Sequence, residues 1–228
     1  MFRTILCAAL VVQAAATSPA PSVPVPARYR GGVLPPIPIR ALGGGEVLLE
    51  LSVSRDSVIT GIKVLRATPP FTDALTTAVH GWQFMPAEQD VEPVPGAPPV
   101  SPTPREPADS TVLVAGLFLP PALNAPTLGE PPRDVAAPSS PETPFPLSTP
   151  VPLYPPRALM GGLVLVEVRV APGGDVAEAK VVASWPPFDQ PAIDAALQWK
   201  FRPGRVRGLA VPKLAYLVFG FSQPVTSR

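Results

Sequence analysis

The chain has 228 residues, of which 37 are prolines and 15% are charged, and its net charge is +1. A hydrophobic content of 46% excludes a fully disordered chain, and the near-neutral charge gives no indication of nucleic-acid binding. Because proline fixes φ and lacks a backbone N–H, so many prolines do not fit within helices and sheets. We therefore expect small packed units separated by proline-rich segments.

The first 16 residues have the layout of a secretory signal peptide. Arg3 precedes an apolar run from Ile5 to Val12, and an Ala-x-Ala site ends at Ala16. A helix over residues 5–16 would span about 18 Å, which is short of the roughly 30 Å hydrocarbon core. We expect export with cleavage after residue 16, or retention as an uncleaved inner-membrane anchor. A proline-rich segment, residues 17–35, follows.

An internal repeat organises the rest of the chain. A shift of 117 residues aligns the sequence with itself without a gap. The matched pairs include Arg40-Ala41-Leu42 with Arg157-Ala158-Leu159, Pro69-Pro70-Phe71 with Pro186-Pro187-Phe188, and Trp82 with Trp199. We interpret the chain as two copies of one unit, at residues 36–120 and 151–224.

Each copy predicts two strands in succession. In the first copy, apolar residues alternate from Val47 to Val53, and a second strand is expected over Ile59–Ala67. In the second copy, Leu163–Val170 alternates in the same way, and a glycine turn leads into Val176–Ser184. A period of two with β-branched residues is typical of half-buried strands, so each pair predicts a hairpin.

A helix and a third strand complete each copy. The helices follow the two Pro-Pro-Phe sequences, with Thr72 and Asp189 as the expected N-caps. The third strands are expected over Thr111–Leu119 and Lys213–Ser222. In the first copy a proline-rich insert, residues 87–110, precedes the third strand.

The predicted fold class is α+β, with two repeats of a β-β-α-β unit. Each repeat is expected to form a three-stranded antiparallel sheet with a helix on one face. A proline-rich linker, residues 121–150, joins them and allows either separated or folded-back copies.

The second copy resembles the TonB C-terminal domain family (TonB/TolA-like). The residues that carry the resemblance are Tyr154-Pro155, Gly162-x-Val164-x-Val166, Gly173-Gly174-Asp175-Val176, Ala195-x3-Trp199-x-Phe201-x-Pro203-Gly204 and Val211-Pro212. The first copy resembles a degenerate member, because it lacks the Tyr-Pro pair and has Arg55-Asp56-Ser57 in place of the glycine turn.

The resemblance implies a periplasmic binding module. Family members pair a sheet edge with an extended segment of an outer-membrane receptor, and some contact peptidoglycan. The implied edge is the last strand, and the partner-binding residues are then Tyr154, Arg157, Lys213, Leu214, Tyr216 and Val218. The alternative is a structural, self-associating envelope protein whose two units bury each other's edges.

Charge distinguishes the two copies. Residues 36–120 carry 5 basic and 9 acidic side chains, whereas residues 153–228 carry 9 basic and 5 acidic ones. The two copies could therefore attract each other, within one chain or between chains. Four of the basic residues form a candidate anion-facing patch for cell-wall or lipid headgroups: Lys200, Arg202, Arg205 and Arg207.

The residue inventory favours a binding protein over an enzyme. The single cysteine, Cys7, lies in the expected signal peptide, and the single histidine, His80, aligns with Leu197 of the repeat. We expect His80 to be structural, Trp82 and Trp199 to be core residues, and no metal or cofactor to be bound. No Gly-rich phosphate loop or distinctively spaced carboxylate pair is present in the sequence.

Overall fold

The computed structural model describes residues 24–38, 43–91, 103–120, 136–156, 158 and 160–222. The expected signal peptide, Arg157 and parts of both expected proline-rich connections lie outside the described residues. Neither helix in the described residues has the length and apolar content that a membrane span requires.

The elements of the first half, in chain order, are β1 (Arg28–Gly31), β2 (Gly45–Val53), β3 (Ile59–Arg66), α1 (Phe71–His80), β4 (Gln83–Met85), β5 (Ala87–Asp90), β6 (Arg105–Ala108) and β7 (Ser110–Phe118). Those of the second half are β8 (Phe145–Ser148), β9 (Gly162–Val170), β10 (Val176–Ala183), α2 (Asp189–Ala196), β11 (Lys200–Arg202), β12 (Arg205–Val206), β13 (Leu209–Ala210) and β14 (Lys213–Phe221). Each half therefore contains strand, strand, helix and long last strand in the expected order.

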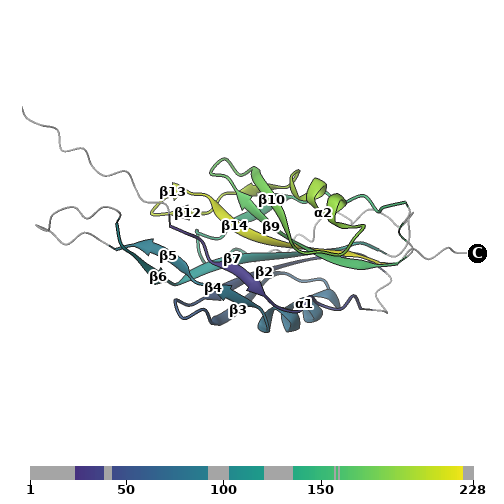
Figure 1. Cartoon of the computed structure of the whole chain (residues 1–228), viewed down its shortest axis with the longest axis horizontal. Coiled ribbons are helices and arrows are strands. Elements are labelled where there is room, and N and C mark those ends of the chain that lie inside the picture. Colours follow the sequence, from purple (N-terminus) through teal and green to yellow (C-terminus); the bar gives the residue numbers. More distant parts are fainter. Residues whose placement is uncertain are drawn as a thin grey trace, which may run out of the picture.

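The six long strands form one continuous sheet in the order β10-β9-β14-β7-β2-β3 (Figure 1). All neighbours are antiparallel except β7 and β14, which pair in parallel at the centre. The expected pair of separate three-stranded sheets is therefore corrected to a single mixed sheet. The last strands of the two halves meet, because each is the edge that its own half leaves open.

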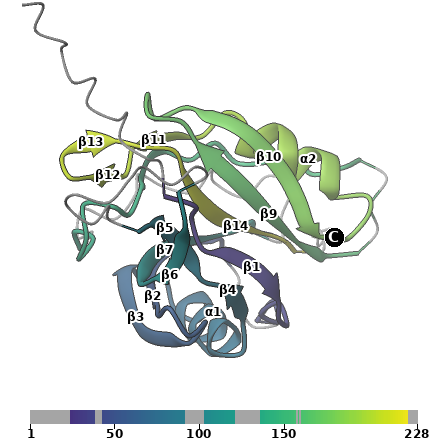
Figure 2. The same ribbon diagram turned by 60° about the vertical axis from the view of Figure 1, so that its left-hand side comes forward.

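The two helices cover opposite faces of this sheet (Figure 2). Alternation in the strands explains the arrangement, since successive side chains point to opposite faces. In β2 the α1-facing residues are Val47, Leu49, Leu51 and Val53, and in β9 the α2-facing residues are Val164, Val166, Val168 and Val170. β14 serves both cores, with Ala215, Leu217 and Phe219 on the α2 face and Tyr216 and Val218 on the α1 face.

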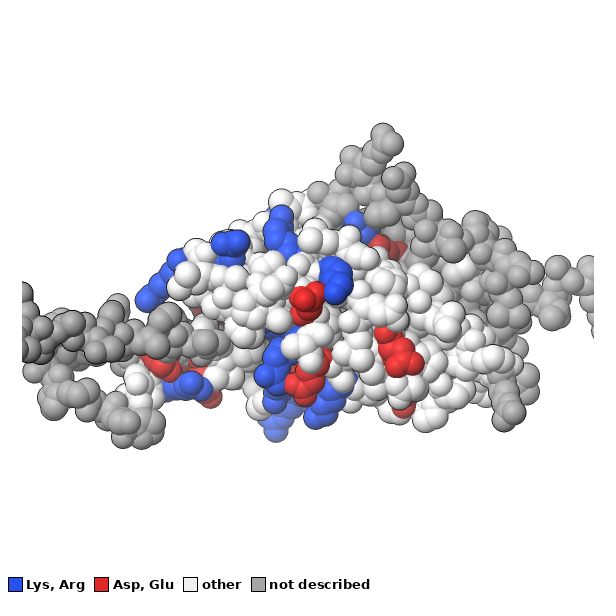
Figure 3. All heavy atoms as spheres, turned by 90° about the horizontal axis from the view of Figure 1, so that it is seen from above, with Lys and Arg blue, Asp and Glu red and all other residues white. Residues whose placement is uncertain are grey.

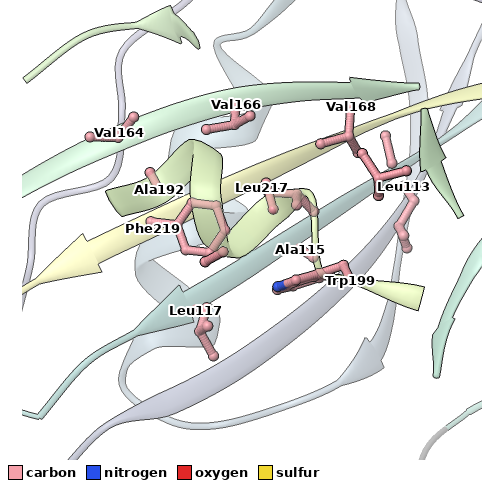
Figure 4. Close-up of a cluster of buried hydrophobic side chains, with 14 of the residues drawn as sticks. Leu113, Ala115, Leu117, Val164, Val166, Val168, Ala192, Trp199, Leu217 and Phe219 are labelled. Carbon is pink, nitrogen blue, oxygen red and sulfur yellow. The ribbon is translucent and has the colours of Figure 1, made fainter. Parts of the chain in front are cut away.

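Trp199 is part of the hydrophobic core between α2 and the sheet (Figure 4). The indole is completely buried, and its ring lies edge-on to Phe219 with centroids 6.0 Å apart. Its Nε1 donates to the carbonyl of Pro150 at 3.1 Å, and Trp82 donates in the same way to Val33 at 3.0 Å. Both tryptophans are thus core residues that also fix the chain entering their own half.

The two helices begin without the expected side-chain caps. α1 begins at Phe71, and the Thr72 hydroxyl instead accepts a hydrogen bond from the backbone N–H of Thr68. α2 begins at Asp189, whose carboxylate accepts from the Trp185 N–H and the Ser184 hydroxyl of the preceding turn. The helix boundaries agree with the Pro-Pro-Phe pattern, but both N-cap assignments are wrong.

Short strands occupy segments expected to be irregular. β1 lies in the expected N-terminal proline-rich segment and pairs with β4, while β8 lies in the expected linker and pairs with β11. β5 and β6 form a hairpin within the expected insert. The 117-residue spacing of the sequence repeat also separates β1 from β8, β2 from β9, β3 from β10 and β4 from β11.

The continuous sheet predicts a single cooperative unfolding transition for the whole chain. β7 and β14 are almost entirely buried at the centre, so neither half can retain its core when the other unfolds. Tryptophan fluorescence and far-UV circular dichroism should give coincident urea curves. Two resolved transitions would contradict the single-sheet arrangement.

Candidate functional site

The expected partner-binding strand is an interior strand of the sheet. β14 pairs with β9 along its whole length and with β7 from Ala215 to Gly220. Tyr216 and Val218 are completely buried, and Leu214 is 6% exposed. The expectation that β14 presents a free edge is therefore corrected, because β7 occupies that edge.

Tyr216 belongs to a buried polar contact between the two halves. Its hydroxyl donates to Glu167 Oε2 at 3.0 Å and accepts from the backbone N–H of Tyr29 at 2.7 Å. Arg28 lies 3.5 Å from the other oxygen of Glu167. Burial, reinforced by the neighbouring Glu167 carboxylate, raises the pKa of Tyr216 far above its ordinary value. Residues 24–34, here called the N-terminal strap, thus cross from β4 of the first half to β9 and β14 of the second.

A second strap crosses in the opposite direction. Residues 136–148, here called the linker strap, pair with β11 through β8 and reach Glu50 on β2. The Glu50 carboxylate, 2% exposed, accepts hydrogen bonds from the Thr143 hydroxyl at 2.5 Å and from the backbone N–H groups of Ser139 and Ser140 at 2.6 and 3.3 Å. Burial acts to raise the pKa of Glu50, but these hydrogen bonds outweigh it and hold the pKa below its usual value.

The remaining predicted partner-binding residues contact their own chain. The Tyr154 ring packs edge-on against Phe188, with centroids 5.6 Å apart, and its hydroxyl donates to the Met160 carbonyl at 2.9 Å. Lys213 is buried, and its Nζ lies 2.9 Å from Glu142 Oε2 in the linker strap. Arg157 lies outside the described residues. The structure gives Tyr154 and Lys213 packing roles and does not gather the predicted set on one surface.

The four basic residues of the candidate anion-facing patch are exposed on β11 and the β12–β13 hairpin. Lys200 Nζ lies 2.7 Å from Asp175, and the Arg202 guanidinium lies 5.2 Å from the centroid of the Phe145 ring. Arg205 donates to the carbonyl of Gly208, and Arg207 occupies the turn with a φ of 51°. On the face above α2, basic side chains gather toward the end that carries β12 and β13, and acidic and basic side chains lie close together nearer the middle (Figure 3).

The described residues contain no cluster of His, Cys, Asp and Glu side chains suited to hold a metal ion. His80, at the end of α1, places Nδ1 2.7 Å from the carbonyl of Thr76 in its own helix. Two hollows of about 150 and 340 Å³ lie beside the straps. The first is lined by the ion-paired side chains of Arg28, Glu167, Arg169 and Glu178, and the second by serine and threonine hydroxyls together with Asp109 and Glu142.

The outer strands of the sheet, β3 and β10, are its two edges. The β3 edge is partly covered, since Leu65 accepts a hydrogen bond from Ala136 N–H at 2.8 Å and Lys63 donates to the Ala137 carbonyl. Within the described ranges, the backbone of residues 177–183 has hydrogen-bond partners only on β9. The edge of β10 is therefore a backbone surface open to a partner, and its pairing could not be read from the sequence pattern.

The two cores are each covered by a helix, and the edge of β10 offers backbone groups to which an extended segment could add a strand. In a comparison with known families, residues 150–221 match the model described as Gram-negative bacterial TonB protein C-terminal. The domains of this family are periplasmic, non-enzymatic protein-interaction domains that contact outer-membrane receptors. The match begins just after β8 and ends with β14, and no curated protein matches the chain.

Removal of the Tyr216 hydroxyl should destabilise the fold. Tyr216→Phe leaves the Tyr29 N–H and Glu167 without their buried partner, which costs about 1–3 kcal/mol. Tyr154→Phe is the matched control, because its hydroxyl bond to Met160 is exposed and should cost less. Urea denaturation measures both values, and equal losses would contradict the role of the N-terminal strap.

The Glu50 carboxylate should make stability depend on pH. Because its folded pKa is depressed, the carboxylate stabilises the fold above its unfolded pKa, and this stabilisation is lost as pH falls through the folded pKa. Glu50→Gln should therefore be less stable than the native chain at pH 7, with a difference that shrinks on acidification. Glu106→Gln, at an exposed site, is the control and should leave the pH profile unchanged. A constant difference across pH would contradict the assignment.

Proposed function

We propose that the chain is an exported, non-enzymatic binding module of the periplasm, in which the second half is the TonB-C-like domain. The family match to residues 150–221 is the observation that carries this proposal. The expected signal peptide supplies the route of export.

We further propose that the first half is a degenerate copy of the same unit. The shared 117-residue spacing of strands supports this interpretation, as do the two tryptophan indoles that donate to equivalent carbonyls. In this account the first copy closes the edge of β14 and completes the sheet. The copy that matches the family, the second, provides the edge for the partner.

The proposed ligand is an extended segment of an outer-membrane receptor or another envelope protein, bound during TonB-dependent transport. An extended segment can add a strand to a sheet edge, because its backbone satisfies the exposed N–H and C=O groups. β10 is the edge that fits this role, since β14 is interior and the linker strap contacts β3. The side chains of β10 would then determine which extended segments bind.

The second candidate is a structural envelope protein that associates with itself or with the cell wall. The parallel pairing of β7 with β14 favours this candidate. Each of these strands would otherwise be an edge at which a partner could bind, and each is occupied by the other half of the chain. The exposed basic groups of β11 and the β12–β13 hairpin are the surface that would face an anionic cell-wall or lipid group.

Site-specific photocrosslinking in intact cells tests the proposed function. A photoreactive residue at Val182 on β10 should capture an outer-membrane receptor or another envelope protein, identified by mass spectrometry. The control position, Asp194 on the exposed surface of α2, should not capture the same protein. Identical capture from both positions would contradict an edge-specific site, and capture of only the chain itself would favour the second candidate.

A further inference from the structure

The β10 edge carries a charge pattern that the rest of the sheet edge lacks. Glu178 and Lys180 are exposed, lie two residues apart and flank Ala179. Glu178 is paired with Arg169 on β9, whereas Lys180 has no ion-pair partner among the described residues. The outer strand at the other edge, β3, carries only the cations Lys63 and Arg66.

The sequence Glu178-Ala179-Lys180 is complementary in charge to a second copy of itself that runs antiparallel. If two copies of β10 lie antiparallel with Ala179 opposite Ala179, then Glu178 of each copy faces Lys180 of the other. The arrangement has twofold symmetry, so the favourable contact occurs twice, and directly opposed unlike charges stabilise antiparallel strands. The same operation on β3 places no acid opposite either cation.

We propose that β10 is the docking surface for a second copy of this chain. Two molecules pair their β10 strands antiparallel about Ala179, which joins the two six-stranded sheets into one. Figure 2 shows β10 along the outside of the sheet, with α2 behind it. The pairing also covers an open edge, which otherwise invites aggregation.

The geometry of β10 limits the length of this contact. Its register with β9 is regular from Glu178 to Val181 and shifts between Val176 and Glu178 and again between Val181 and Ala183. Such irregularities bend the strand and interrupt pairing. The dimer contact is therefore short, and it can be exchanged for an envelope segment that uses the same backbone groups. Only this exchange rests on the proposed function; the dimer does not.

Engineered cysteines test the twofold register. In the full chain with Cys7→Ser, Ala179→Cys should form a disulfide-linked dimer on mild oxidation, because directly opposed residues have Cα atoms about 4.5–5.5 Å apart. Ala177→Cys is the matched control: it faces Val181 of the other copy and lies about 13 Å from its own equivalent. It should not crosslink alone but should crosslink when mixed with Val181→Cys.

Charge reversal tests whether the contacts between Glu178 and Lys180 hold the two copies together. Glu178→Lys and Lys180→Glu should each weaken dimerisation by about tenfold or more in sedimentation equilibrium. An equimolar mixture of the two single variants should restore dimerisation, because a chain with two basic side chains then faces a chain with two acidic ones, while the contacts with β9 remain those of each single variant. A chain that stays monomeric would overturn the proposal. Equal crosslinking by Ala177→Cys and Ala179→Cys alone, or a mixture that dimerises as weakly as the single variants, would also overturn it. Failure of the cellular crosslinking at Val182 to capture an envelope protein, with the dimer intact, would overturn the proposed function alone.

Discussion

The parallel pairing of β7 with β14 joins the two halves of the chain. It converts two small sheets into one sheet with a helix on each face, so that β14 contributes side chains to both cores. Gly220 makes close packing possible there, since a Cβ at this position would lie 2.5 Å from Cδ1 of Phe118. A three-stranded unit with one helix buries a smaller fraction of its surface than a larger domain does, and the shared sheet increases the apolar surface that each half buries.

The two straps reinforce the same contact from outside the sheet. The N-terminal strap delivers the Tyr29 N–H to Tyr216, and the linker strap delivers two backbone N–H groups and a hydroxyl to Glu50. Each strap also pairs with a short strand after a helix, so each half is bound to the other through backbone and side chain. The proline-rich stretches are thus in part structural elements of the fold, because an extended backbone is what both proline and an edge strand require.

The sequence predicts the local structure well and the assembly less well. Alternation of valines and leucines identifies β2 and β9, and the aligned tryptophans identify two cores, because these signals are local in the chain. The pairing of Ala215 with Leu113 involves residues far apart in the sequence, and the period-two pattern is the same for an edge strand and a central one. Yet Lys213–Phe221, KLAYLVFGF, is apolar at nearly every position, and that composition is typical of a strand buried on both faces. Read this way, it would have indicated an interior strand and directed attention to β10.

Native-state hydrogen exchange of β14 measures whether β7 covers this strand in the folded protein. If β14 is an interior strand, the amides of Tyr216 and Val218 should exchange only through global unfolding, with a free energy equal to that from urea denaturation. They should be as protected as the amides of β9, whereas an edge strand leaves alternate amides open to solvent. Rapid exchange of alternate β14 amides in the folded protein would contradict the account, because it would mean that β7 does not cover this edge.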